Sequence, residues 1–411
     1  MKDPLETEER VETRSAIWVA ALIGAVLVLL VLVRPSLTVT IALIVGLILT
    51  VMLHEAGHMI VAKRSGMKVT EFFLGFGPRI WSFRRGETEY GIKAIPAGGY
   101  VRIIGMNSIE EVDPEDEART YRAASFPKRL ATIMAGIAVN LLIAFVLIFF
   151  VLLRVGAPQG PNTTVSSVTP KAPAAIAGFH AGDRVLSIDD HRVDNWEDVP
   201  RLVQARTGEL TRFVVERDGK QVVLEATPKP RSASDSSGFV GIAPGETRTS
   251  LGLVGSVRES VVTMWDGTVA TGQGIARIFS PSGVQRQVSD VTRAGPQPQA
   301  PAGVDVERPR SVIGIVSIGD QIVRGDIWTF LFLLATINLF LALFNMIPLL
   351  PFDGGHAAVA CYEAVMSKIR GHRVQVDYRR LVPITAMVLA VLLVFGASTM
   401  FLDIREIITG S

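Results

Sequence analysis

The chain has 411 residues, of which 49% are hydrophobic and 19% charged, and its formal net charge is +2. A mean hydropathy of +0.38 is too high for a soluble protein with ordinary surfaces, so much of the chain is expected to lie in a membrane. Lysine and arginine are spread without a basic tract, which excludes nucleic acid as a partner. Cys361 is the only cysteine. This excludes an intramolecular disulfide framework, and we expect Cys361 to be a buried packing residue.

Five uncharged stretches are long enough, or nearly so, to cross a hydrocarbon core of about 30 Å as helices. They are residues 17–33, 37–53, 130–153, 327–350 and 381–402. The acidic N-terminus lacks the positive region of a secretory signal, so we expect the first stretch to be retained. Arg34, Pro35 and Ser36 separate the first two stretches, which favours a tight helical hairpin over one long kinked helix.

Positively charged residues flanking the spans predict the orientation of the chain. Residues 61–129 and the segment after the fourth span are rich in lysine and arginine, which places both on the cytoplasmic side. Residues 155–325 are then extracytoplasmic, and the N-terminus is cytoplasmic. The predicted localisation is the cell (plasma) membrane, which the chain crosses several times.

The extracytoplasmic segment predicts a small α+β domain followed by less regular chain. The expected strands are 164–168, 184–189, 211–217 and 220–226, with a helix at 195–206. Asp218-Gly219 is typical of a hairpin turn between the last two strands. Residues 251–279 have the apolar spacing of an amphipathic helix that could lie on the membrane surface. The composition of residues 285–311 predicts a flexible linker.

The central motif is His54-Glu55-Ala56-Gly57-His58. Two histidines at positions i and i+4 lie on one helix face, close enough to bind one zinc ion. Glu55 between them can reach a metal-bound water as general base. In a soluble helix the same pattern would more often arise by chance. Here it lies at the inner end of an apolar span, where such side chains are costly and usually functional, which favours a metal site.

A catalytic zinc site usually has three protein ligands and an open position for water. The best candidate for the third ligand is Asp353, in the segment NMIPLLPFDGGH at residues 345–356. Two prolines and two glycines interrupt the helix there, and such backbone at membrane depth must face protein or a wet cavity. Asp353 could instead cap the helix that begins at Gly354. Glu71 and Glu363 are the other nearby acidic candidates, and they fit less well by position.

Four separated motifs together carry a family resemblance. In chain order they are HEAGH at 54–58, GFGP at 75–78, TEYGIKAIPAGGYV at 88–101 and NMIPLLPFDGGH at 345–356. They resemble the bacterial site-2 protease (regulator of sigma-E protease) family, and in particular its actinobacterial members. The resemblance covers nearly the whole chain, from about residue 40 to residue 402.

This resemblance implies a zinc-dependent intramembrane endopeptidase that cleaves transmembrane segments of single-span membrane proteins, such as anti-sigma factors or remnant signal peptides. The residues that it assigns are the zinc ligands His54, His58 and Asp353, the catalytic base Glu55, and the substrate-binding asparagines Asn345 and Asn338. Asn140 is a weaker candidate, because isoleucine stands at position 137 where proline is common in the family. The lipid bilayer is the expected surrounding.

Two further segments bear on substrate handling. A helical substrate must be unwound before cleavage, because its carbonyl groups are hydrogen-bonded and shielded. Residues 79–84 and 88–95 predict a hairpin turning at Arg85-Gly86, whose edge either holds the unwound chain by strand addition or simply packs on the core. Residues 173–189 resemble the bacterial PDZ pattern, which implies either peptide binding or a size filter for bulky substrates.

The predicted fold is a polytopic α-helical membrane protein with about five spans: a four-span core, one extra N-terminal span, a membrane-associated β-hairpin and an extracytoplasmic PDZ-like α+β domain. Its predicted parts are the tail and extra span 1–36, the HEAGH helix 37–62, the hairpin region 63–129, a helix at 130–154, the PDZ-like domain 160–230, a linker with the amphipathic helix 231–325, the Asp353 helix region 326–370 and the last helix 381–403. A non-catalytic PDZ scaffold would predict a broken zinc motif. A metal transporter would predict a second, inverted set of ligands. The sequence has neither feature, so an intramembrane protease is favoured.

Overall fold

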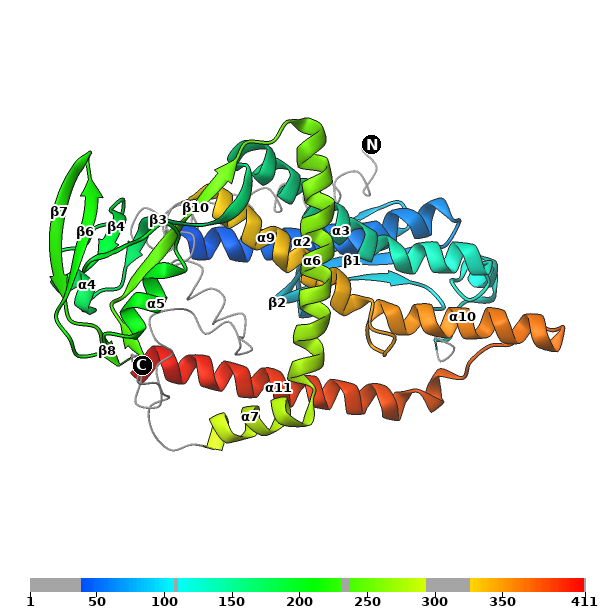
Figure 1. Cartoon of the computed structure of the whole chain (residues 1–411). Coiled ribbons are helices and arrows are strands. Elements are labelled where there is room, and N and C mark those ends of the chain that lie inside the picture. The colour runs from blue at the N-terminus through cyan, green and yellow to red at the C-terminus, as the bar shows by residue number, and fades with distance from the viewer. Residues whose placement is uncertain (1–37, 107–109, 231–236, 293–325, 410–411) are drawn as a thin grey trace. The chain divides into compact units, whose positions relative to one another are not determined.

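The computed structural model describes residues 38–106, 110–230, 237–292 and 326–409 (Figure 1). The predicted span at 17–33 lies outside these residues. The chain divides into two compact units. Among the described residues, the helical unit comprises 38–106, 110–151, 260–284 and 326–400, and the sheet unit comprises 152–230, 237–259, 285–292 and 401–409.

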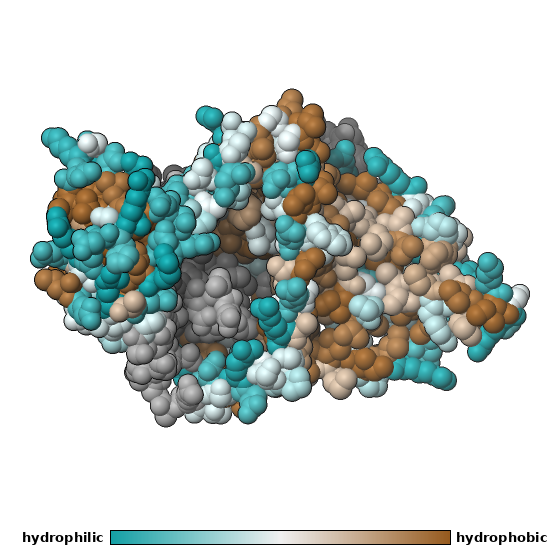
Figure 2. Space-filling view, in the orientation of Figure 1, coloured by the Kyte–Doolittle hydropathy of each residue, from teal (hydrophilic) through white to brown (hydrophobic). Residues whose placement is uncertain are grey.

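Four helices in the described part of the chain are long and apolar enough to cross a membrane. They are α2 (Thr38–Arg64), α3 (Phe126–Val155), α9 (Ile327–Asn345) and α11 (Val382–Thr409). Each coincides with a predicted span. Large apolar side chains stay exposed along all four, and much of the visible surface of the helical part is hydrophobic (Figure 2). Such a surface is stable in lipid and costly in water.

The ends of these helices follow from local sequence. Asp326 precedes α9, and its carboxylate accepts hydrogen bonds from the backbone N–H groups of Trp328 and Thr329. This cap satisfies donors that the first helical turn cannot. Helix α10 (Asp353–Arg370) ends at Gly371, which adopts the left-handed conformation with φ 69° that favours glycine. The chain then passes through the 3-10 turn η3 (Tyr378–Arg380) into α11.

A long hairpin follows α2 and covers more residues than predicted. Strands β1 (Val69–Arg85) and β2 (Thr88–Ile103) are antiparallel, and the turn falls at the predicted place. Phe73 pairs with both Gly91 and Tyr100, so residues 69–74 lie between the two halves of β2. Residues 99–103 therefore form an outer edge of this small sheet. The 3-10 helix η2 (Pro114–Arg119) connects the sheet to α3.

The sheet unit has an α+β fold with its own core. Its strands are β3 (Ala157–Val168), β4 (Arg184–Ile188), β5 (His191–Arg192), β6 (Thr211–Arg217), β7 (Lys220–Ala226) and β10 (Ile242–Thr249), in the order β10-β3-β4-β6-β7 with β5 beside β4. Short helices α4 (Pro173–Ile176) and α5 (Asp198–Gln204) and the two-residue strands β8 (Lys229–Pro230) and β9 (Gly238–Phe239) complete it. Phe213 and Val215 of β6 are fully buried. The predicted hairpin is confirmed, with positive φ at Asp218 and Gly219.

A buried ion pair holds one end of this sheet. Arg217 of β6 donates two hydrogen bonds to Asp183, whose side chain is fully buried. Burial by itself would raise the pKa of Asp183. Hydrogen bonds from Arg217 and from the backbone N–H of His180 outweigh this effect and hold the pKa below its ordinary value. The charged carboxylate thus ties the loop before β4 to the hairpin.

Three sequence predictions need correction. Strand β10 belongs to the sheet, although we expected the chain after residue 230 to be linker. Residues 285–292 lie in helix α7 (Pro281–Thr292), not in a flexible linker. Cys361 on α10 is exposed rather than buried. The predicted helix at 251–279 is confirmed as α6 (Leu253–Ile278).

Candidate metal centre

Helix α2 presents the two histidines of the HEAGH motif on one buried face. His54 and His58 are 6% and 7% exposed, and their Nε2 atoms lie 3.2 Å apart. One helical turn separates the two residues, which sets their rings at neighbouring levels on the same side. Gly57 lies between them, and a Cβ there would be 2.8 Å from the carbonyl oxygen of Ala135. Glycine at this position therefore lets α3 approach α2 closely.

Asp353 reaches the same point from the other side of the helical unit. It is the first residue of α10, after the turn that follows α9. A Cβ at Gly354 would lie 2.3 Å from the carbonyl oxygen of Met346, and one at Gly355 would lie 2.4 Å from the amide nitrogen of Leu350. The glycine pair thus allows the turn to fold tightly against the start of α10.

The side chain of Asp353 does not cap its own helix, which rules out that alternative. The residue at the cap position is Phe352, and the helix start has no side-chain hydrogen bond. Oδ2 of Asp353 instead lies 3.1 Å from Nε2 of His54 and 3.3 Å from Nε2 of His58. The predicted ligands, 295 positions apart in the chain between His58 and Asp353, therefore meet across the helices.

The triangle of donor atoms has the dimensions of a zinc site. Its edges are 3.1, 3.2 and 3.3 Å. In a tetrahedral site with bonds of about 2.0–2.1 Å, neighbouring donor atoms lie about 3.3 Å apart. Oδ2 of Asp353 is buried without a hydrogen bond of good geometry. Two imidazoles and one carboxylate are a donor set typical of catalytic zinc, so these residues fit the ion.

Helix α3 supports the histidines at close range. The backbone carbonyl of Thr132 accepts a hydrogen bond from Nδ1 of His58 at 2.8 Å, which leaves Nε2 of that ring free to bind a metal. A Cβ at Gly136 would lie 2.3 Å from Nε2 of His58 and 2.8 Å from Cε1 of His54. Only glycine leaves room for both rings. Neither α3 residue was predicted from the sequence, although Gly136 stands in the small-residue segment before Asn140.

Glu55 is half-buried and lies close to both the ligand triangle and the hairpin. Its carboxylate accepts a hydrogen bond from the backbone N–H of Val101 in β2. Gly99, two residues earlier on the same strand, lies against Met52 of α2. The outer edge of the hairpin therefore runs directly beside the HEAGH turn. No motif or spacing in the sequence indicates this contact.

The two predicted asparagines have different surroundings. Asn338 is fully buried in α9, and its amide nitrogen donates to Oγ1 of Thr50 at 3.1 Å and to the carbonyl of Leu334 at 2.8 Å. Asn345 is half-buried at the last residue of α9, ahead of the turn that leads to Asp353.

The other acidic candidates are engaged elsewhere. Glu363 pairs with the buried Arg129 of α3 at 2.5 Å. Glu71 on the hairpin pairs with Arg102 at 3.1 Å and accepts a hydrogen bond from Tyr100. Burial would raise the pKa of Glu71, but these partners outweigh it and hold that pKa below its ordinary value. Neither glutamate is among the residues that converge on a metal position in the described chain.

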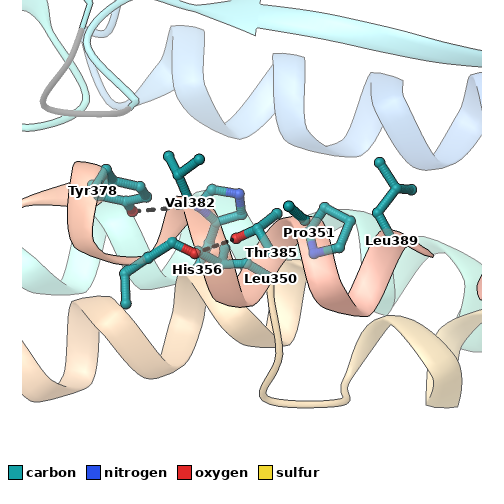
Figure 3. A pocket seen from close by; sticks show the side chains of 9 residues that line it. Leu350, Pro351, His356, Tyr378, Val382, Thr385 and Leu389 are labelled. Carbon is teal, nitrogen blue, oxygen red and sulfur yellow. Dashed lines mark hydrogen bonds between the residues drawn. The ribbon is translucent and has the colours of Figure 1, made fainter. Parts of the chain in front are cut away.

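An apolar cavity of about 360 Å³ adjoins the segment that carries Asp353 (Figure 3). Leu350 and Pro351 of the turn line one side of it, and Val382 and Leu389 of α11 line the other. His356, one turn after Asp353, also lines the cavity, with Nδ1 3.4 Å from the hydroxyl of Tyr378. The cavity thus separates the turn before α10 from the last span.

The chain is similar in sequence to a peptidase family and to zinc metalloproteases. The sequence profile of peptidase family M50 matches residues 42–393. The zinc metalloprotease Rip1 of Mycobacterium tuberculosis is 35% identical over 396 residues, which cover 87% of this chain and 95% of Rip1. A putative zinc metalloprotease of Brucella suis is 30% identical, covering 81% of this chain and 88% of its own.

Among solved structures, the PDZ domain of an SdrC-like protein from Listeria monocytogenes covers 21% of this chain and 92% of its own, at 19% identity and a TM-score of 0.19. The family assignment rests on the profile and on the two metalloproteases. The match to the M50 profile includes the HEAGH helix and the Asp353 turn, and it extends over most of the chain. This chain therefore belongs to peptidase family M50, the site-2 protease family, and is a zinc metalloprotease.

Proposed function

We propose that this protein is an intramembrane endopeptidase that hydrolyses peptide bonds within the transmembrane segments of single-span membrane proteins. The observation that carries the proposal is the convergence of His54, His58 and Asp353 on one point among apolar, membrane-length helices. We assign these three residues as the zinc ligands. Zinc, when bound, supplies Lewis-acid chemistry that acidifies a water and polarises the peptide carbonyl.

Glu55 is the residue to which we assign the proton transfers. It follows His54 directly, so its carboxylate lies beside the ligand triangle and within reach of an attacking water. In the proposed reaction it takes a proton from that water and later passes it to the leaving amine. The hydrogen bond from Val101 holds the carboxylate at the side where β2 runs past the site.

We assign to Asn345 the stabilisation of the substrate carbonyl oxygen during attack. It ends α9 just before the turn that carries Asp353. A side-chain N–H at this place can stabilise the negative charge that grows on the carbonyl oxygen during attack. Asn338 lies two turns earlier with its amide nitrogen already engaged by Thr50 and Leu334, so we do not assign it a substrate contact.

The outer edge of β2 is the proposed binding place for the unwound substrate. Residues 99–103 have β1 on one side only. The N–H of Val101 points away from β1, toward Glu55. A substrate strand added to this edge would therefore present its peptide bonds beside the proposed base, with main-chain hydrogen bonds replacing those of the unwound helix.

Substrates such as anti-sigma factors or remnant signal peptides fit this proposal, because each offers a single short span. The PDZ-like domain would act either by binding an extended chain or as a size filter. A non-catalytic scaffold is the alternative function. The whole ligand triangle counts against a scaffold, since a binding module would have no use for three convergent metal donors.

Separate replacement of each proposed ligand by alanine tests the proposal. In full-length protein reconstituted with a single-span substrate, His54→Ala, His58→Ala and Asp353→Ala should each lose stoichiometric zinc and cleavage, because two remaining donors hold the ion weakly. Metal analysis and mass spectrometry of the products measure this. His180→Ala, which removes an exposed histidine of the sheet unit, is the matched control and should change neither. Cleavage that persists in all three ligand variants would refute the assignment.

The proposed orientation has its own test. Positive residues within 61–129 should keep the hairpin on the cytoplasmic side of the membrane, which puts the sheet unit on the extracytoplasmic side. A reporter that is active only outside the cytoplasm, fused near residue 190, should therefore score as active. The same reporter fused at residue 110 should be inactive. The reverse pattern would invert the proposed orientation.

A further inference from the structure

Besides Oδ2 of Asp353, three polar atoms near the candidate metal centre are buried without a hydrogen-bond partner in the described part of the chain. They are Nδ1 of His54, Oδ1 of Asn140 and Oδ1 of Asn338. The three residues are 6%, 1% and 0% exposed, so bulk solvent does not reach them. A buried polar atom without a partner destabilises the fold, and three such atoms on adjoining helices call for a common explanation.

The three residues lie on neighbouring turns of α2, α3 and α9. Asn338 donates to Thr50, which precedes His54 by one helical turn. Asn140 follows Gly136 by one turn on α3, and Gly136 lies directly against the ring of His54. By helix periodicity both asparagines therefore lie about one turn from the level of His54, at the level of Thr50 on α2.

The hydrogen-bonding capacities of these atoms are complementary. If Nε2 of His54 binds zinc, the ring proton lies on Nδ1, which becomes a donor. The two Oδ1 atoms are acceptors. For Asn338 this orientation of the amide is fixed, because the carbonyl oxygen of Leu334 can only accept and therefore must face the nitrogen. One water that accepts one hydrogen bond and donates two would satisfy all three atoms, and three bonds are typical of a buried water.

We propose that Asn140 and Asn338 are positioning residues for zinc, which act on His54 through one enclosed water. This inference rests on the proposed ligand set and adds the residues that orient it. His58 needs no such device, since a backbone carbonyl of Thr132 already fixes its ring. The two histidines are therefore held differently. Substitution of either asparagine can release the ring of His54, whereas no side-chain substitution removes the backbone carbonyl that holds His58.

Zinc affinity of the full-length protein in detergent, measured by competition with a chelator, tests the inference without any proteolysis assay. Asn140→Leu and Asn338→Leu keep similar volume and remove the acceptor, and each should weaken zinc binding about 10- to 100-fold. Asn140→Asp keeps an acceptor oxygen and should bind zinc about 10- to 100-fold more tightly than Asn140→Leu. Thr399→Val removes a buried hydroxyl from α11 and is the matched control, with unchanged affinity expected.

Thermal unfolding of the metal-free variants separates positioning from folding. Asn140→Leu should unfold near the temperature of the metal-free unaltered protein, because its Oδ1 has no hydrogen-bond partner within the protein. Asn338→Leu should unfold at a lower temperature, because it also loses the hydrogen bonds to Thr50 and to the carbonyl of Leu334. Unaltered zinc affinity in both leucine variants would overturn the inference, as would Asn140→Asp binding as weakly as Asn140→Leu. Loss of zinc in His54→Ala alongside that result would leave the proposed ligand set standing. Retention of zinc in His54→Ala would overturn both.

Discussion

Replacing Glu55 by glutamine should lower kcat/KM about 10²- to 10⁴-fold and leave zinc bound. Glutamine keeps the size of the side chain and an oxygen that can accept from Val101, but it cannot take a proton from the attacking water. Because Glu55 lies outside the triangle of donor atoms, metal occupancy should not change. Cleavage of a reconstituted single-span substrate and metal analysis of the same preparation measure the two effects.

The control for this experiment is Glu209→Gln, which removes an exposed carboxylate of the sheet unit and should have no effect on either measurement. If Glu55→Gln cleaves the substrate at the unaltered rate, Glu55 is not the general base. Simultaneous loss of zinc and cleavage would mean instead that Glu55 takes part in holding the metal.

Much of the candidate site could be predicted from the sequence, because its chemistry is local in two places. His54 and His58 are one turn apart on a single helix, so their shared face follows from helix geometry alone. Asp353 stands in a segment that cannot continue a helix at membrane depth, which indicates a functional turn. The structure brings these three side chains to one point, as the motifs led us to expect.

The surroundings of the ligands could not be predicted in the same way. The role of Gly136 follows only from the two imidazole rings that occupy the space where a Cβ would lie. Thr132 contributes a backbone carbonyl, which any residue could supply. The contact between Glu55 and Val101 joins a helix to a strand 46 positions away. No periodicity or spacing encodes such tertiary contacts, so they become visible only once the helices and the hairpin are packed.

The fold, like the site, could be predicted from the sequence only in part. The long apolar helices were predicted at the right places in the chain, because hydropathy over about 20 residues is a strong signal, but α2 and α11 continue past the predicted ends of their spans. Strand β10 carries Pro244 and Gly245 and lacks the apolar alternation that marks a strand. Residues 242–249 form a strand because they pair with β3 in the folded unit, and their local sequence does not predict this long-range contact. Helix α7 was likewise obscured, since its polar composition resembles a linker.

Gly136→Ala should release zinc and lower cleavage about 100-fold or more, although it adds one methyl group. That methyl would lie 2.3 Å from Nε2 of His58 and 2.8 Å from Cε1 of His54, so the rings or α3 must move. A displacement of about 1 Å in a catalytic group is enough to cost about 10²-fold in rate. Alanine is a better helix former than glycine by about 1 kcal/mol, so α3 itself should form normally.

Gly396→Ala in α11 is the matched control for this last substitution. A Cβ there meets nothing within 4 Å, and the same gain in helix propensity applies. Zinc content, zinc affinity and cleavage should therefore equal those of the unaltered protein in Gly396→Ala and fall together in Gly136→Ala. If Gly136→Ala keeps full zinc affinity and activity, then α3 does not pack against the ligands as described, and the tight approach of α3 to α2 at Gly57 must be wrong as well.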